Sequence, residues 1–174
     1  MATKEHALGR LFDITPVIMP ADLVGGAKTG KRIHLKHGKT VTFVAIKATD
    51  AGTTDDFALD LQEHNAASGG TSQDLDIIGD YFTKTETTLD GDESWVRTTD
   101  STPQSEIDAI AGTAEVEMLL VVEVTAAELS DGYEWVSVNT PDLGSTDVQT
   151  GCVIAIISDL AAARKPENLP DWLT

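Results

Sequence analysis

The chain has 174 residues, of which 29 are acidic and 12 are basic, and its formal net charge at pH 7 is −17. This length suits one domain with a substantial core, and the charge argues against nucleic acid, whose phosphates would be repelled. No run of about 18 apolar residues is present to span a membrane, and the sequence from Met1 lacks the apolar stretch of a signal peptide. The single cysteine, Cys152, argues against a disulfide-built secreted protein.

Residues 1–30 are predicted to form an extended N-terminal arm. The stretch from Leu11 to Met19 is rich in apolar residues but follows no helical or strand period. Pro16 and Pro20 exclude a continuous helix. Because apolar surface in an irregular segment needs a covering surface, we expect the arm to contact another chain. The arm residues expected at that interface are Phe12, Ile14 and Ile18.

A hairpin is predicted next, from Arg32 to Ala48. Apolar and polar residues alternate on both sides of His37-Gly38, which is a plausible two-residue turn. A further strand is expected from Phe57 to Glu63. It is followed by a loop of small and polar residues from Asn65 to Ser72.

Two more strands are expected around a turn at Leu89–Asp92. The threonine-rich stretch before this turn has high strand propensity. The second strand is expected at Ser94–Thr98, after the turn. Residues 100–112 are expected to form a long polar connection, in part helical.

The centre of the fold is predicted between Glu115 and Ile157. In the first strand of this stretch, alternate residues from Val116 to Val124 place one apolar face toward the core. Thr125 and Glu128 then have the spacing of a capping box that opens one helical turn. A second strand follows from Tyr133 to Val138. The unbroken apolar run from Cys152 to Ile157 predicts a strand buried on both faces.

These patterns predict an all-β sandwich of about eight strands, a jelly roll being one form that it can take. The expected organisation is an arm over residues 1–30, the sandwich over 31–163 and an extended tail over 164–174. Pro166 and Pro170 keep the tail extended, and Trp172 is expected to hold it against a neighbouring subunit.

Charge is unevenly distributed along the chain. Residues 23–49 carry Lys and Arg but no acid, whereas residues 50–163 carry only Lys84 and Arg97 among many acids. Such segregation favours pairing of the two regions, within the fold or across a subunit contact. The alternative is a solvated basic hairpin on an acidic body. The basic residues expected at an interface are Lys31, Arg32 and Lys36.

Two familiar site motifs are excluded. Gly25 to Lys31 matches the start of a phosphate-binding loop, but Arg32 occupies the position of the required Ser or Thr. His34 and His37 are three residues apart on a predicted strand, so they point to opposite faces and do not suit one metal ion.

Other polar groups have ordinary interpretations. Two acidic runs offer oxygen ligands for Ca²⁺, but neither has the spacing of an EF-hand loop, and Asp-Gly is common in ordinary turns. The first run is Asp50, Asp55, Asp56 and Asp60, and the second is Asp90, Asp92 and Glu93. Ser68, Ser72 and His64 form no nucleophile elbow. Trp95, Trp135 and Tyr133 are expected in the core or an interface, a carbohydrate platform being the alternative. We therefore expect no enzyme activity, no cofactor and no bound metal ion.

Several loop and turn segments resemble a family of small structural proteins of tailed bacteriophages, encoded near the major capsid protein. The similarity extends from about Leu8 to Pro170. The segments that carry it are Gly30–Ile33, Gln62–Ser72, the Thr88–Gly91 turn before Trp95, Leu129–Glu134 and Arg164–Pro170.

This resemblance implies a virion structural protein. The role that we expect is a capsid decoration, or cement, protein on the outer surface of the capsid, where an acidic body is kept away from packaged DNA. Its expected partners are the major capsid protein and further copies of itself, with no nucleic acid and no membrane. A head–tail connector or a tail completion or terminator component is the first alternative. A β-sandwich ligand-binding module is the second.

Overall fold

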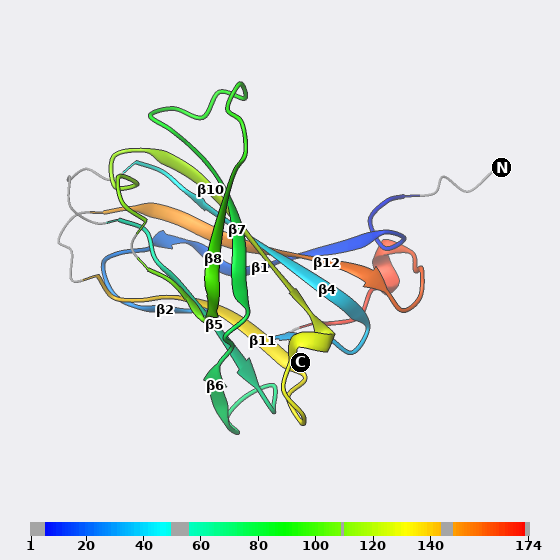
Figure 1. The fold of residues 1–174 in the computed structure, drawn as a ribbon. Helices are drawn as coiled ribbons and strands as arrows, with labels where there is room; N and C mark the ends of the chain where they lie inside the picture. The colour runs from blue at the N-terminus through cyan, green and yellow to red at the C-terminus, as the bar shows by residue number, and fades with distance from the viewer. Residues whose placement is uncertain (1–5, 50–55, 109, 144–147, 173–174) are drawn as a thin grey trace.

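The computed structural model describes residues 6–49, 56–108, 110–143 and 148–172, and it is an all-β sandwich of two antiparallel sheets (Figure 1). The described residues contain no α-helix. Two short 3₁₀ turns are present, η1 (Ala126–Glu128) and η2 (Pro166–Asn168). None of the helical segments that the structure describes is long and apolar enough to cross a membrane.

The larger sheet, sheet A, has six strands. In spatial order they are β1 (Phe12–Asp22), β12 (Thr150–Leu160), β4 (Gly38–Lys47), β10 (Glu117–Thr125), β7 (Ile78–Glu86) and β8 (Val96–Gln104). Sheet B is built around β11 (Trp135–Thr140) and β5 (Leu59–His64). Its other strands are β2 (Lys28–Thr29), β3 (Ile33–His34), β6 (Ser72–Asp74) and β9 (Glu106–Ile107).

The strand order is that of a jelly roll with one added hairpin. Four antiparallel pairs, β1–β12, β2–β11, β4–β10 and β5–β6, roll up so that successive strands alternate between the sheets. The β7–β8 hairpin extends sheet A beyond β10, and its tip projects from the sandwich (Figure 1). The predicted fold class is therefore confirmed, in its jelly-roll form.

The core lies between the sheets and follows from strand alternation. On β10, Met118, Leu120 and Val124 have no exposed surface, as the period of two predicts. The opposing layer includes Leu61 and Val136 from sheet B, which are also fully buried. Thr125 begins η1, where its backbone N–H donates to the Glu128 carboxylate at 2.6 Å, as the capping-box spacing indicates.

The predicted hairpin from Arg32 to Ala48 is wrong. β3 pairs with β11 in sheet B, whereas β4 pairs with β12 and β10 in sheet A. The turn at residues 35–37 therefore carries the chain from one sheet to the other. The local sequence indicates that the chain reverses direction here, but it does not say which strands will pair with the segments on either side of the turn.

The N-terminal segment is more regular than expected. From Phe12 to Asp22 it forms β1, an edge strand paired with β12, with register shifts after Pro16 and Ile18. Proline is tolerated on an edge because one side of the strand has no hydrogen-bonding neighbour. The helical content expected within residues 100–112 is absent from the described residues, which form β8 and β9 and end in a turn.

The strand expected to be buried on both faces is buried on one. Val153, Ala155 and Ile157 of β12 are buried, whereas Cys152, Ile154 and Ile156 are only half-buried. The second apolar face of β12 therefore belongs to the outer surface of sheet A.

Candidate interaction surfaces

One end of the sandwich is basic. Here the turn at residues 35–39, the N-terminal residues 6–11 and the segment 158–170 lie together. The Ala161 N–H donates to the His37 carbonyl at 2.8 Å, and the Arg164 N–H donates to the Gly9 carbonyl at 2.7 Å. We call this the basic end. Its exposed cations are Arg10, Lys36, Lys39, Arg164 and Lys165, and they outnumber the two exposed acids of the same segments, Asp159 and Glu167.

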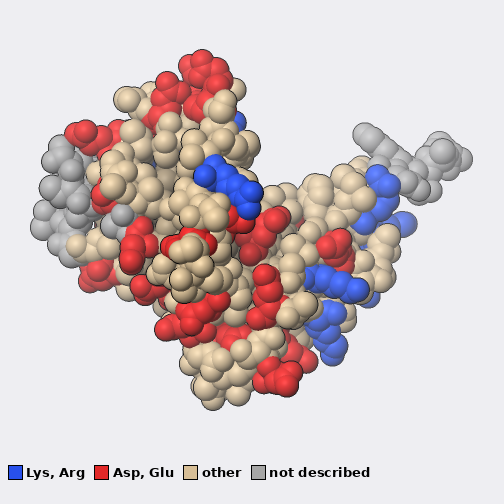
Figure 2. Space-filling model, viewed as in Figure 1, with Lys and Arg blue, Asp and Glu red and all other residues tan. Residues whose placement is uncertain are grey.

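The rest of the visible surface is mainly acidic. Figure 2 shows Asp and Glu side chains spread over the body of the sandwich and the tip of the β7–β8 hairpin, while most Lys and Arg side chains lie on the right and one further basic group lies in the middle of the body. The charge segregation in the sequence thus becomes a separation in space. A molecule of this kind attracts another copy end to body, or an acidic surface at its basic end.

The basic residues of the 23–49 segment do not form one surface. Lys36 and Lys39 lie at the basic end, but Lys47 is 2% exposed and donates to the Val116 carbonyl at 2.7 Å. Lys31 and Arg32 lie beside the glycine-rich loop, residues 65–71. Together with Gly30 and residues 67–69 they line an open hollow of about 500 Å³.

Arg32 is engaged within its own chain. Its guanidinium donates to the Ala66 carbonyl at 2.7 Å, the Gly69 carbonyl at 2.8 Å and the Ser72 hydroxyl at 3.2 Å. These bonds fix the glycine-rich loop against sheet B. Lys31 remains exposed at the rim of the hollow, so the two neighbouring cations have different roles.

His64 connects the same loop to the core. Its Nδ1 lies 2.7 Å from the Ser72 hydroxyl and its Nε2 lies 2.8 Å from the Ser137 hydroxyl. Burial, followed by the positive charge of Arg32, lowers the pKa of His64 from 6.5 to about 4. The imidazole is therefore neutral at pH 7.

The His64 cluster does not reproduce a catalytic triad. Ser72 and His64 are in contact, which the sequence did not predict, whereas Ser68 lies apart in the hollow. The second imidazole nitrogen meets the hydroxyl of Ser137, not a carboxylate that would stabilise an imidazolium ion. Arg32 also opposes that charge. The arrangement is that of a structural tie between the loop and β11.

The apolar residues expected at an interface have different environments. Ile18 is 6% exposed and Trp172 is 4% exposed, and both belong to the core of their own chain. The Trp172 indole N–H donates to the Asp13 carboxylate, and its carbonyl accepts the His34 N–H at 3.0 Å. Their side chains are thus already covered. Phe12 is half-buried and Ile14 is 47% exposed, so Ile14 retains surface for another chain.

The outer face of sheet A, the face turned away from sheet B, is apolar at its centre. Register places the outward side chains in rows across the strands, because directly paired residues point to the same side. One row contains Ile154, Val44, Val121 and Phe82, which are paired in that order. Five further apolar residues belong to the adjacent rows. They are Ile14, Ile156, Cys152, Ile46 and Leu119. We call these nine residues the outer patch, and none of them is buried.

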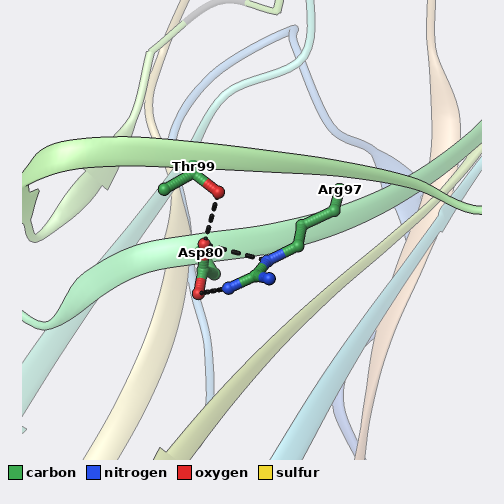
Figure 3. Close-up of polar contacts among 3 residues, drawn as sticks. All are labelled: Asp80, Arg97 and Thr99. Atoms are coloured by element: carbon green, nitrogen blue, oxygen red, sulfur yellow. Dashed lines mark hydrogen bonds and ion pairs between the residues drawn. The ribbon is translucent and has the colours of Figure 1, made fainter.

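Charged groups lie at the β7–β8 edge of this face. The Arg97 guanidinium donates to both Asp80 oxygens, at 3.1 and 2.5 Å, and the Thr99 hydroxyl donates to Asp80 at 2.7 Å (Figure 3). The hydrogen bond from Arg97 is the largest influence that lowers the pKa of Asp80. Nearby, the Lys84 ammonium lies 5.2 Å from the centre of the Trp95 ring, which is half exposed.

Four carboxylates cluster at the tip of the β7–β8 hairpin. Oxygens of Glu86, Asp90, Asp92 and Glu93 lie within 4.8 Å of one another. Desolvation and then the neighbouring negative charges raise the pKa of Glu86. Glu93 already accepts the backbone N–H groups of Asp90 and Gly91, at 2.6 and 3.2 Å. This bonding is that of a turn.

The other acidic run that offers oxygen ligands for Ca²⁺ is not brought together among the described residues. Asp50 and Asp55 lie outside the described residues. Asp56 accepts the backbone N–H of Thr113 at 2.8 Å, and Asp60 accepts the amide of Asn139 at 3.2 Å. Trp135 is 7% exposed and stacks on His34 with ring centres 4.1 Å apart, which removes its face from any carbohydrate platform.

Comparisons with known proteins give one distant neighbour. No protein-family model matches the sequence, and no curated protein matches it. Among solved structures, the chain is similar to the SPBc2 prophage-derived protein YomS at 11% sequence identity and a TM-score of 0.40, covering 84% of this chain and 91% of that chain. The neighbour is a phage-derived protein, at a distance that transfers no function to this chain.

Proposed function

We propose that the chain is a structural protein of a tailed-phage particle, and that within the particle it decorates the outer surface of the capsid by binding the major capsid protein. The observation that carries the proposal is the separation of a basic end from an acidic body. A decoration protein must attach to a shell and also tolerate many copies of itself side by side. A basic end on an acidic body serves both needs.

Three of the segments that carry the resemblance to phage structural proteins lie together in the fold. Arg32 of the Gly30–Ile33 segment bonds to the loop within Gln62–Ser72. The Leu129–Glu134 segment meets the same region, since the Ser130 N–H donates to Glu63 at 2.8 Å. Three segments that are far apart in sequence therefore form one unit.

The jelly roll alone does not select this role. The same architecture occurs in capsid proteins and in lectin domains, and a fold does not fix a function. What favours a role in assembly is the surface: a basic end, an acidic body and an apolar outer patch. The first alternative, a connector or tail completion role, places the same kind of surface in a ring instead of a shell.

Copy number in purified particles separates the two roles. Quantitative mass spectrometry of phage particles should give a copy number comparable to that of the major capsid protein. A number that fits a single ring would contradict decoration and favour the neck. Absence from the particle would contradict both virion roles.

Charge reversal tests the attachment itself. The double variant Lys36→Glu, Lys39→Glu should bind empty capsids more weakly than wild type, and binding should weaken as salt rises. Exposed pairs contribute only about 0–1 kcal/mol each, so the effect is collective. The control, Lys28→Glu with Lys31→Glu, changes the net charge equally but lies away from the basic end. Equal binding by the two double variants at low and high salt would show that the basic end is not the attachment surface.

A further inference from the structure

The outer patch lacks a packing partner among the described residues. The inner face of sheet A packs on sheet B, and its residues on β4, β10 and β12 are almost fully buried. The outer face of the same strands is apolar at its centre, where Ile46 is 39% exposed, and the apolar area continues onto β7 with Phe82 at 37% and β1 with Ile14 at 47%. Antiparallel sheets that face water normally carry polar residues there. An apolar outer face therefore indicates a docking surface.

The size of the outer patch is appropriate for a modest interface. The area that encloses it extends over five strands spaced about 4.8 Å apart and three rows about 6.8 Å apart, which gives a footprint of roughly 450 Å² once side-chain width is added. Thr42, Glu123 and Lys84 occupy part of this footprint. Patches of about 300–600 Å² are the largest that monomers usually expose. Two such footprints in contact bury roughly 900 Å², and the polar rim brings the total near the lower limit of specific interfaces, about 1,200 Å².

The charge of this face indicates what can cover it. Lys84 and Arg97 are the two basic residues in the acidic stretch 50–163, and both point to the outer face, paired with Leu119 and Phe82 respectively. Arg97 neutralises Asp80. The same register places four acids on the outer face, Asp80, Glu86, Glu117 and Glu123, around an apolar centre without charged side chains. The two cations offset half of these acids, in a chain of net charge −17. The acidic bodies of two copies repel each other, so the uncharged centre of the outer face is where two bodies can meet sheet to sheet.

We propose that the outer face of sheet A binds the same face of a second copy, so that two sandwiches stack sheet against sheet about a twofold axis. Aligned sheets pack about 10 Å apart with their side chains interdigitated. The outer patch supplies the apolar centre of this contact on both sides. The contact is self-complementary because the same side chains meet across the axis. It does not depend on the phage assignment.

Association should be reversible and concentration dependent. Analytical ultracentrifugation over a dilution series should show a monomer–dimer equilibrium that shifts toward dimer as salt screens the net repulsion. Val121→Lys and Ile154→Lys, at the centre of the outer patch, should leave the chain monomeric over the same range. Both side chains point outward, so thermal unfolding should remain close to wild type. The control is Val148→Lys, which replaces a 56% exposed side chain outside the outer patch and should dimerise like wild type.

Cys152 provides a native probe of the same face. It is the single cysteine of the chain and belongs to the outer patch. Its reaction rate with a thiol reagent should fall as protein concentration rises, and it should be independent of concentration in Val121→Lys. A wild-type chain that stays monomeric would overturn the proposal. So would dimers that form without protecting Cys152, because they use another surface. Protection that appears only on addition of empty capsids would assign the face to the shell instead of a second copy.

Discussion

The pH dependence of the free energy of unfolding should show that His64 is neutral in the folded protein. This side chain is 3% exposed and lies between two serine hydroxyls. Burial and the charge of Arg32 lower its pKa from 6.5 to about 4. In the unfolded chain the imidazole is protonated as the pH falls through 6.5, whereas in the folded protein it is protonated only near pH 4. Its contribution to stability is therefore complete above pH 6.5, lost as pH falls between these values, and constant below them.

The expected magnitude follows from the two pKa values. One pKa unit corresponds to about 1.4 kcal/mol, so the full loss is about 3 kcal/mol. Between pH 7 and pH 5 the free energy of unfolding should fall by about 2 kcal/mol from this group alone. Asp60 and Glu106 act in the opposite direction, because burial raises their pKa values. A comparison with a His64 variant cancels their effect.

The assay is urea unfolding of wild type and His64→Gln at both pH values. Wild type should lose about 2 kcal/mol more than His64→Gln, because the amide side chain does not titrate. His37→Gln is the control, since it removes an exposed imidazole and leaves His64 in place. If wild type and His64→Gln lose the same free energy, the buried imidazole is not held neutral and the reasoning from its surroundings fails.

Two further predictions concern packing. Trp172→Ala should lower the free energy of unfolding by about 3–5 kcal/mol in urea, because a buried aromatic side chain is removed. Trp95→Ala, at a half-exposed position, should cost far less, and equal losses would show that the tail does not complete the core. Gly151→Ala should lower the melting temperature, because its Cβ would lie 2.6 Å from the Ile46 carbonyl oxygen. Gly79→Ala, whose Cβ would meet nothing closer than 3.9 Å, should melt near wild type.

The strands themselves were predictable because their signals are local. Alternation along 117–125 and 59–64 identifies a buried face without reference to the rest of the chain. The capping box at Thr125 is local in the same sense. The class of fold follows, because many short strands without an amphipathic helix leave a sandwich or barrel as the way to bury those faces.

Pairing required the tertiary structure. The sequence around His37 predicts a hairpin, but the strands before and after this turn pair with β11 and β12 respectively. Those two strands lie about a hundred residues further along the chain. The same holds for β1, whose prolines exclude a helix but are compatible with an edge strand. Long-range pairing depends on which faces fit together, and that information is not contained in any single segment.

The features of the candidate surfaces also divide into those that the sequence determines and those that depend on the tertiary structure. The sequence determined that the chain is acidic, that its cations are concentrated in one segment and that Cys152–Ile157 is apolar on both faces. Only the tertiary structure decided that Arg32 holds a loop while Lys36 faces solvent, and that one apolar face of β12 enters the core while the other joins the outer patch. The physical reason is that charge and hydrophobicity belong to individual residues, whereas exposure depends on the neighbours that folding brings to them.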